Sequence, residues 1–328
     1  MTGAPVLEMR DVFLTYNPPE GPVPAVRGVN LTVAPGEVLG VAGESGCGKS
    51  TLISTVLRLF PSNAKVEGEV LVDGENVFDM KWNRMRAVRW GEAAVVFQGA
   101  LHSLNPIQRI GKQLIEPILL HDKGSSEASA MKKVRELLDQ VGLPKRHANA
   151  YPHQLSGGQK QRVMIALALT CDPKVLLCDE PTTALDVMVQ AQILELLKGI
   201  ARDRAMGMLI ISHDLSVLSS NCDRIAIMYA GRVVEQGDAL DLFEHPAHPY
   251  TRALMGAFPT IGDEASRYAP SGLAGDPPFP GDLPEGCSFH PRCPRATDEC
   301  TTVDVQLEPV GVGRLAACIH VTDRAGAR

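Results

Sequence analysis

The sequence lacks the features of a membrane-spanning, secreted or nucleic-acid-binding protein. No apolar run approaches the ~18–20 residues that a membrane helix needs, so any role at a membrane is expected to come through other subunits. The opening segment MTGAPVLEMRDVFLTY has no basic stretch followed by an apolar one, so we expect no signal peptide and a cytosolic location. Lys and Arg number 32 against 38 Asp and Glu, and the net charge of −6 predicts no nucleic-acid partner.

What is present is the composition of an ordinary globular protein. The chain has 328 residues, 45% of them hydrophobic and 21% charged, which is enough for one large domain or two. Its eight cysteines are unevenly spread. Four are scattered through the first 240 residues, whereas the other four crowd together near the end, at Cys287, Cys293, Cys300 and Cys318. This contrast predicts a boundary near residue 240, with a domain over 1–240 and an extension over 241–328.

Apolar strand-like segments alternate with helix-like ones along the first domain. The segments that predict strands are 6–16, 37–42, 66–72, 93–97, 174–178, 207–211 and 224–229. Helical spacing follows at 49–59 and 187–203, and it dominates a stretch from about 100 to 170. The alternation predicts an α/β fold, with a parallel sheet covered by helices and a helical insertion. Beyond residue 240 the Pro- and Gly-rich stretch 269–286 predicts a linker or loop-rich segment.

A glycine-rich loop lies between one of these strands and a helix. It reads Gly43-Glu44-Ser45-Gly46-Cys47-Gly48-Lys49-Ser50 and is followed by Thr51. Such a P-loop lets backbone N–H groups surround phosphate oxygens at a helix N-terminus. Lys49 would reach the β- and γ-phosphates of ATP, and the Ser50 hydroxyl would bind Mg²⁺. Cys47 fills a variable position, so a neutral filler is preferred to a redox-sensitive thiol.

A second element, VLLCDE at 175–180, ends a buried strand in two carboxylates. In α/β sheets ligands bind at the C-terminal edge of the strands, which places these side chains near the P-loop. Asp179 would bind Mg²⁺ directly or through water. Glu180 would act as the general base for the water that attacks the γ-phosphate.

A third motif identifies the class of ATPase. Leu155-Ser156-Gly157-Gly158-Gln159, followed by Lys160-Gln161-Arg162, closely resembles the signature motif of ABC ATPases. Its Ser hydroxyl and Gly amides open a helix and form a second anion-binding N-terminus, although a plain N-capped helix would look the same. A single subunit has no second nucleotide to offer this motif, so the motif is expected to meet ATP held by another ATPase domain.

Other positions match the ABC family in the family's order. The resemblance implies that Gln98 contacts Mg²⁺ and water and links hydrolysis to a transmembrane partner. It also implies that Ala184-Leu185-Asp186 lies across a dimer, that His213 holds the γ-phosphate and that Tyr16 stacks on adenine. The implied fold is a P-loop ABC cassette, with a mixed sheet core, an antiparallel β subdomain and a helical subdomain, followed by a small loop-rich extension.

Further segments are similar to the ATPases of oligopeptide, dipeptide and nickel importers. They are SLNP at 103–106, YPHQLSGG at 151–158, QRVMIALAL at 161–169, CDEPTTALDVMVQAQIL at 178–194, HPAHPYTRALMGAFP at 245–259 and GCSFHPRCPRATDEC at 286–300, with Cys318 and His320 beyond them. This similarity implies an ATP-hydrolysing subunit of a peptide importer, with nickel, glutathione or oligosaccharide as alternative cargo. Many relatives have Asp-Pro where this chain has residues 99–102, which bears on the cargo and not on the class.

The same resemblance implies the assembly. Two transmembrane permease subunits and an extracytoplasmic binding protein are the expected partners, and the chain would lie at the cytoplasmic face of the cell membrane. The helix QRVMIALAL favours a heterodimer with a sister ATPase, with a homodimer as the alternative. A soluble ABC ATPase of DNA repair or translation is less favoured, because the interval between Gln98 and Leu155 has room for a compact helical subdomain and not for a long arm.

The four C-terminal cysteines are expected to stabilise a segment with little apolar mass of its own. Four thiolates can hold zinc or a [4Fe–4S] cluster. The resemblance and the absence of closely spaced Cys pairs favour the cluster, with zinc, or cysteines that are reduced or in disulfides, as alternatives. Two basic segments, 81–89 and 132–136, could touch lipid or a membrane subunit but are more typical of solvated helix faces.

Overall fold

The computed structural model describes residues 3–99, 103–183, 185–256 and 273–321. In these residues the strands form two sheets. The larger sheet has the order β11-β12-β10-β9-β3-β8-β7-β6. Its strands are β3 (Val38–Ala42), β6 (Ala93–Val96), β7 (Val175–Asp179), β8 (Gly207–Ile211), β9 (Arg224–Tyr229), β10 (Arg232–Asp238), β11 (Glu308–Gly311) and β12 (Arg314–Ala316). Strands β9, β3, β8, β7 and β6 run parallel, whereas β10, β12 and β11 are antiparallel to their neighbours.

The parallel part of this sheet is buried on both faces, which explains why its strands are continuous apolar runs. In β3, Val38 and Ala42 belong to one buried cluster and Leu39 and Val41 to another. The same alternation holds in β7 and β8, as expected for side chains that point to opposite faces of a strand. All five residues of each of these three strands are buried. The carboxyl ends of the strands are therefore held rigidly, and the polar residues that follow them are fixed in place.

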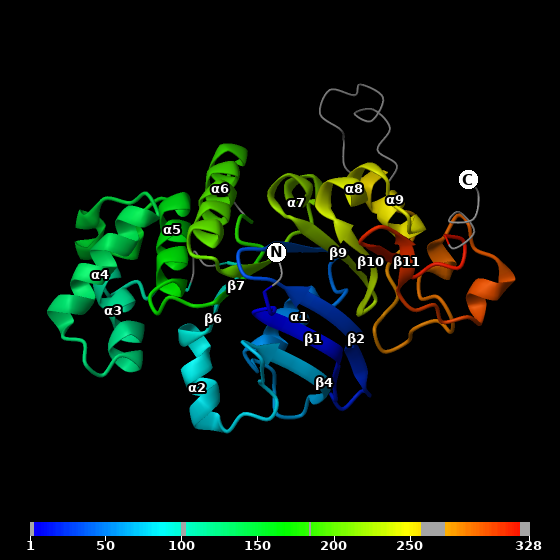
Figure 1. Ribbon diagram of the computed structural model, residues 1–328, viewed down its shortest axis with the longest axis horizontal. Coiled ribbons are helices and arrows are strands. Elements are labelled where there is room, and N and C mark those ends of the chain that lie inside the picture. The colour runs from blue at the N-terminus through cyan, green and yellow to red at the C-terminus, as the bar shows by residue number, and fades with distance from the viewer. Residues whose placement is uncertain (1–2, 100–102, 184, 257–272, 322–328) are drawn as a thin grey trace.

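One face of the large sheet packs against the smaller, antiparallel sheet (Figure 1). This sheet has the order β2-β1-β4-β5, with β1 at Leu7–Tyr16, β2 at Val23–Val33, β4 at Lys65–Val72 and β5 at Glu75–Asn76. Buried residues of helices α1 (Lys49–Val56) and α2 (Trp82–Gly91) belong to the same apolar cluster. The P-loop lies directly between β3 and α1.

The other face is covered by helices, which include the insertion on the left of Figure 1. The insertion contains α3 (Ile110–His121), α4 (Glu127–Gln140), the 3₁₀ turns η2 (Lys145–Asn149) and η3 (Pro152–Gln154), and α5 (Gly157–Ala168). Helices α6 (Val187–Asp203) and α7 (Leu215–Asn221) follow β7 and β8. The hydrophobic faces of α3, α4 and α5 contribute to one continuous core with β7 and β8, so the insertion is packed on the sheet.

The C-terminal segments pack at the β10 end of the large sheet, on the right of Figure 1. They include α8 (Ala239–Glu244), α9 (Pro249–Gly256), η4 (His290–Arg292) and η5 (Asp298–Thr301). Strand β12 pairs with β10 through Glu235↔Ala316 and Gln236↔Leu315. The fully buried Glu235 carboxylate accepts hydrogen bonds from the backbone N–H groups of Ala247 and His248 and from Arg314, at 2.8, 2.9 and 3.1 Å. The segments beyond residue 240 therefore extend the sheet of the preceding domain, and the division at 240 stays a prediction.

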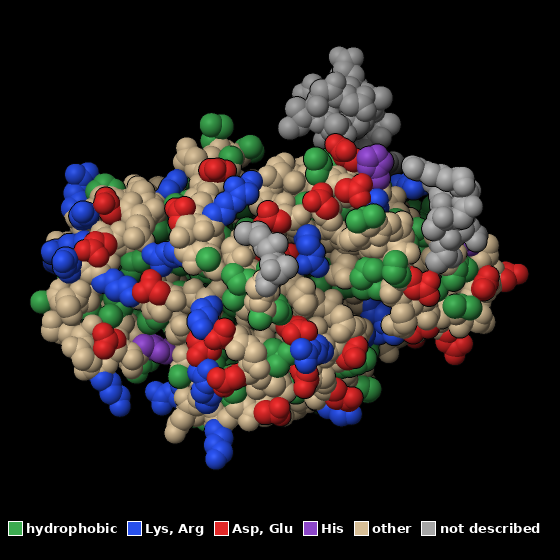
Figure 2. All heavy atoms as spheres, in the orientation of Figure 1, with side chains coloured by type: hydrophobic (Ala, Val, Ile, Leu, Met, Phe, Trp, Pro, Cys, Tyr) green, Lys and Arg blue, Asp and Glu red, His purple; other side chains and the backbone are tan. Residues whose placement is uncertain are grey.

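Charges of both signs are interspersed on the face shown in Figure 2. Residues of the two basic segments take part in ion pairs. Arg84 contacts Glu75 and Glu92 at 2.8 and 2.6 Å, and Lys133 contacts Asp172 at 2.5 Å. This pairing favours the interpretation of these segments as solvated helix faces. Within the described residues, no helix is long and apolar enough to cross a membrane.

Candidate functional site

The P-loop has a backbone path that glycine alone fits at two positions. Gly43 and Gly48 have φ angles of 152° and 103°. A Cβ atom at Gly43 would lie 2.2 Å from the Met228 carbonyl oxygen, and one at Gly48 would lie 2.2 Å from the Ala25 carbonyl oxygen. Gly46, with φ of 80°, has open space where its Cβ would be. The loop is therefore packed tightly against the protein at both ends and is open in the middle, where its backbone can approach a ligand.

Lys49 is buried and folds back over this loop. Its Nζ donates hydrogen bonds to the carbonyl oxygens of Gly43 and Glu44, at 2.7 and 2.8 Å. The ammonium group is thus held at the mouth of the open loop by two neutral acceptors. A phosphate oxygen would be a stronger, charge-assisted partner for the same group. Cys47 is 5% exposed and burial raises the pKa of its thiol, which agrees with a neutral filler and not with a reactive thiolate.

Two of the three residues expected at Mg²⁺, Ser50 and Asp179, lie together at the carboxyl end of β7. The Ser50 hydroxyl donates a hydrogen bond of 3.1 Å to Oδ1 of Asp179. Asp179 is 7% exposed, and its burial raises the pKa of the carboxyl, against the lowering effects of the Ser50 hydrogen bond and Lys49. A hydroxyl and a carboxylate side by side are the hard oxygen donors that Mg²⁺ prefers, so this pair fits the ion.

Glu180 lies at the centre of a group of polar side chains from three segments, which follow β6, β7 and β8. Oε2 accepts hydrogen bonds of 2.9 Å from both Gln98 and Thr183, and Oε1 lies 3.5 Å from Nδ1 of His213. Glu180 has a left-handed backbone, with φ of 46°, which is unfavourable for a residue with a side chain. The buried strand β7, which ends one residue earlier, holds Glu180 in this conformation. Its carboxylate lies among side chains that follow the carboxyl ends of the strands. The structure therefore brings together Gln98, Glu180 and His213, and their roles toward ATP stay predictions. Gln98 contacts Glu180, and no hydrogen bond joins it to Ser50 or Asp179 within the described residues.

Tyr16 ends β1 next to the first turn of α1. Its hydroxyl lies 3.3 Å from Oγ1 of Thr51. The ring is half-buried and close to the P-loop helix. Adenine stacking by Tyr16 stays a prediction.

The signature motif forms the start of α5. Ser156 caps the helix: its Oγ accepts from the Gln159 N–H at 3.3 Å, and the Gln159 side chain accepts from the Ser156 N–H at 3.0 Å. Gly158 lies against Val189, because an added Cβ would be 2.7 Å from Val189 Cγ1. Among the described residues, no hydrogen bond or ion pair joins Ser156–Gln159 to the P-loop, and α5 lies well apart from α1 in Figure 1. The N-terminal ends of α1 and α5 are thus kept separate within one subunit.

Asp186 has a local structural role in this state. It caps α6, and its side chain accepts a hydrogen bond of 3.0 Å from the Val189 N–H. Ala184 of the same motif lies outside the described residues, as do 100–102 of the segment in which the chain departs from its relatives. The role of Asp186 across a dimer stays a prediction.

The four C-terminal cysteines line one small pocket. Cys287, Cys293, Cys300 and Cys318 surround a cavity of about 10 Å³, room for about one water molecule. Burial raises the thiol pKa of Cys287, Cys293 and Cys318, and the charges of neighbouring cysteines raise it further in each case. Within the described residues, no group of three His, Cys, Asp or Glu side chains is placed to hold a metal ion. The thiols converge, but a multi-atom cluster would fit only if the surrounding segments moved apart.

Two contacts to the P-loop come from residues that the sequence patterns did not single out. Arg292 makes an ion pair with Glu44, and the Tyr250 hydroxyl accepts a hydrogen bond from the Glu44 N–H. The sequence patterns also did not single out Thr183, which donates a hydrogen bond to Glu180. Each of these residues belongs to a motif-like segment, but nothing in its spacing indicates which distant group it would contact.

Comparisons with known proteins agree with this geometry. Residues 26–183 match the family model described as ABC transporter, and residues 234–300 match the one described as oligopeptide/dipeptide transporter, C-terminal region. A solved structure of the ATP-binding cassette MJ0796, dimeric and bound to ADP and Pi in a post-hydrolysis state, is 31% identical with a TM-score of 0.64. It covers 71% of this chain and 98% of its own.

Two curated relatives are similar over nearly the whole chain. The oligopeptide transport ATP-binding protein OppD of Salmonella typhimurium is 41% identical over 95% of this chain and 93% of its own length. OppD of Mycobacterium tuberculosis is 42% identical over 99% of this chain but 54% of its own, so the chain spans about half the length of that relative. The chain therefore belongs to the ABC transporter family, in the group of oligopeptide transport ATP-binding proteins.

Proposed function

We propose that this chain is the ATP-hydrolysing subunit of an ABC importer that takes up peptides. The observation that carries the proposal is the group around Glu180, where a strained carboxylate is held by Gln98, Thr183 and His213 beside the Ser50–Asp179 pair. An open P-loop with a buried lysine lies next to it. The names of the relatives, which are oligopeptide transport ATP-binding proteins, support the peptide cargo.

Hydrolysis follows from the positions of these side chains. Glu180 takes a proton from a water molecule as the water oxygen bonds to the γ-phosphorus. The bond between that phosphorus and the oxygen of the β-phosphate breaks, which gives ADP and phosphate. Gln98 and Thr183 hold one oxygen of Glu180, and the other oxygen, 3.5 Å from Nδ1 of His213, would accept the proton of the water. His213, whose side chain is 64% exposed, would turn from Glu180 to reach the γ-phosphate.

Binding of the triphosphate falls to the P-loop. Lys49 would exchange its two carbonyl partners for β- and γ-phosphate oxygens, and the amides around Gly46 would surround the phosphates. Ser50 and Asp179 would hold Mg²⁺, which supplies positive charge for the developing negative charge on the phosphates.

A working site would need a second ATPase subunit. The capped N-terminus of α5, with exposed Ser156, is the donor surface for the nucleotide held on the partner. The heterodimer with a sister ATPase is our preferred assembly, on the sequence of α5, and a homodimer is the alternative. The dimeric MJ0796 structure supports pairing in general but not the choice between the two.

An apolar groove beside Gln98 supports the proposed permease partners. It has a volume of about 410 Å³, and its lining includes Leu59 after α1, Trp90 of α2, Phe97 after β6 and Met164 of α5. Leu59, Trp90 and Phe97 are 42%, 37% and 44% exposed, which is high for large apolar side chains. A cytoplasmic helix of a permease subunit would bury this surface next to Gln98. The chain would then lie at the cytoplasmic face of the membrane, with the extracytoplasmic binding protein as an indirect partner.

Transport by the whole complex tests the function. Inside-out or proteoliposome preparations with the permease subunits, both ATPases and the binding protein should take up labelled oligopeptide only with ATP and Mg²⁺. Nickel chelate, glutathione and oligosaccharide serve as competing cargoes. Uptake of one of these instead of peptide would overturn the peptide assignment, and ATP hydrolysis without any permease-dependent stimulation would favour a soluble ABC ATPase.

We further propose that the four cysteines bind a metal centre, with a [4Fe–4S] cluster preferred and zinc as the alternative. Support comes from the convergence of the four thiols on one pocket. Occupancy would require the local segments to open around the centre, because the present cavity holds about 10 Å³. Protein purified without oxygen should be brown and contain iron, and Cys293→Ser should lose both the colour and the iron. Cys171→Ser, outside the pocket, is the control, and colourless protein with stoichiometric zinc would rule out the cluster.

A further inference from the structure

One residue of the P-loop is held at each of its polar groups. The backbone N–H of Glu44 donates a hydrogen bond of 2.9 Å to the Tyr250 hydroxyl, and its carbonyl accepts from Lys49 at 2.8 Å. Both carboxylate oxygens accept from Arg292, at 2.7 and 3.0 Å. Two of these three partners, Tyr250 and Arg292, belong to the C-terminal segments. The conformation of the P-loop thus depends on residues more than two hundred positions away.

The Arg292 side chain is nearly buried and makes several hydrogen bonds. Its side chain is 6% exposed, Nε donates to the Ala274 carbonyl at 3.0 Å, and Nη1 lies 3.4 Å from the Tyr229 hydroxyl. The hydrogen bonds to Glu44 are the largest influence that raises the pKa of the guanidinium group. A bidentate pair of this kind, with one partner almost fully buried, is more rigid than an exposed ion pair.

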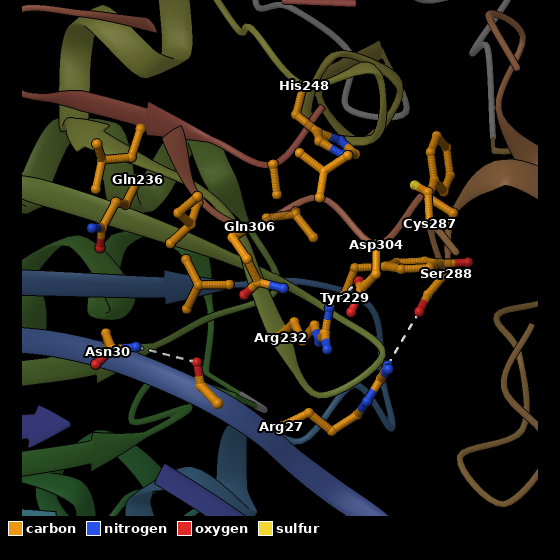
Figure 3. Close-up of a pocket in the computed structure, with 18 residues that line it drawn as sticks. Arg27, Asn30, Tyr229, Arg232, Gln236, His248, Cys287, Ser288, Asp304 and Gln306 are labelled. Carbon is orange, nitrogen blue, oxygen red and sulfur yellow. Dashed lines mark hydrogen bonds and ion pairs between the residues drawn. The ribbon is translucent and has the colours of Figure 1, made fainter. Parts of the chain in front are cut away.

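Ring packing and a second hydrogen bond hold the segment that carries Arg292. The Phe289 ring lies 5.3 Å from the ring of Tyr229 and 5.3 Å from that of Tyr250, and Tyr229 and Tyr250 are 4.6 Å apart. Arg27 of β2 donates 3.1 Å hydrogen bonds to Ser288 and to the Ala230 carbonyl. Figure 3 shows Arg27 and Ser288 pointing toward one another beside a pocket of about 270 Å³, with Cys287 next to Ser288. The segment is therefore attached to both sheets of the preceding domain.

Because Glu44 is negatively charged, its ion pair with Arg292 affects nucleotide binding. A carboxylate in the loop that receives a triphosphate would repel it, and such repulsion is strong where water is partly excluded. Arg292 cancels that charge and also keeps the carboxylate turned away from Lys49, which must be free to move to the phosphates. Tyr250 fixes the Glu44 backbone while Lys49 leaves its carbonyl.

We propose that Arg292 and Tyr250 are positioning residues for the P-loop, so that the C-terminal segments set the affinity of this chain for ATP. This inference rests on the proposed function, because it assigns the loop to ATP. It adds that the ATP site is incomplete without the C-terminal segments.

A double-mutant cycle on the full-length chain tests the proposal. Arg292→Gln should weaken equilibrium Mg-ATP binding and raise the KM for ATP about tenfold, with little change in kcat, since no group around Glu180 is touched. Glu44→Gln loses the ion pair but also the repelling charge, so it should weaken ATP binding less than Arg292→Gln does. The double variant should bind ATP better than Arg292→Gln alone, because the unneutralised carboxylate is gone.

Further variants separate charge from packing. Arg292→Lys keeps the charge but loses the bidentate geometry, so it should fall between wild type and Arg292→Gln. Tyr250→Phe removes the acceptor for the Glu44 N–H and should also raise the KM. Arg295→Gln, an exposed arginine three residues further on, is the matched control and should bind ATP like wild type. Thermal melts identify any variant that does not fold. If Arg292→Gln does not fold, ATP binding is compared between Arg292→Lys and the double variant Arg292→Lys/Glu44→Gln.

The outcomes are distinct. If wild type does not bind ATP, the proposed function fails. If wild type binds ATP and Arg292→Gln binds it equally well, the positioning role is wrong. If Arg292→Gln and the double variant are equally impaired and equally destabilised, Arg292 supports the fold only, and the proposal is also wrong.

Discussion

Replacing Glu180 with glutamine is expected to lower the kcat for ATP hydrolysis by about 10²–10⁴-fold, while ATP still binds. The amide is nearly the same size as the carboxylate but cannot accept the proton of the attacking water. Its neighbours Gln98 and Thr183 would still find an acceptor in the amide oxygen, so the site should keep its shape. Steady-state hydrolysis and equilibrium ATP binding of the same preparation give the two measurements.

Glu195→Gln is a suitable control for this experiment, because Glu195 is exposed on α6 and lies outside the group around Glu180. It should leave both hydrolysis and binding unchanged. Hydrolysis at the wild-type rate in Glu180→Gln would remove Glu180 from its role as general base. Loss of ATP binding would show that the substitution had disturbed the P-loop, and the role would then have to be tested with Glu180→Asp.

Replacing Gly158 with aspartate is expected to lower ATP hydrolysis by the assembled ATPase pair at least about 100-fold. The loss should be confined to the ATP site that the signature motif of this chain, Leu155–Gln159, completes. The new carboxylate would lie in the first turn of α5, where the partner's γ-phosphate is expected. An acidic residue at this place suits the helix dipole, so the helix itself should remain. The added Cβ would lie 2.7 Å from Cγ1 of Val189, so Val189 in the first turn of α6 would have to shift. ATP binding to this chain's own P-loop should be retained.

The structure offers a closely matched control for this substitution. Helix α4 begins with the same kind of capping box, in which Ser126 has the place of Ser156, and Ala128 has the position that Gly158 has in α5. Ala128→Asp should leave hydrolysis unchanged, because α4 is not expected to face nucleotide. Equal loss of activity in both variants would attribute the effect to helix destabilisation. Full activity of Gly158→Asp in the assembled complex would contradict the composite site.

The parallel strands were predictable from sequence because they are buried on both faces, so each one is a continuous apolar run in the sequence. The segments 37–42, 174–178 and 207–211 correspond to β3, β7 and β8 within one residue. Strand β2 was missed, since Pro24, Gly28 and Asn30 interrupt its pattern and its pairing with β1 is irregular. Helix α2 was seen only as a basic segment, because its mean hydropathy is low and few of its residues are buried.

The site was predictable as far as it consists of motifs. Gln98, Glu180 and His213 follow strands that end at the same edge of the sheet, so local sequence was enough to bring them together. The contacts of Arg292 and Tyr250 were not predictable, because they depend on how a loop-rich segment folds back over the domain. Cysteine spacing indicated that four thiols would converge but not how closely, and the pocket they line is smaller than the predicted cluster requires.

The pairing of β12 with β10 also bears on how the protein is made. Strand β10 is complete once residue 238 has been synthesised, but the strands that cover its outer side, β12 and β11, are not made until residues 308–316. Until then β10 has unpaired N–H and C=O groups, which can pair with another chain. A ribosome-bound or truncated chain is thus more prone to aggregate than the finished one, and the late hairpin protects the sheet edge in the mature protein.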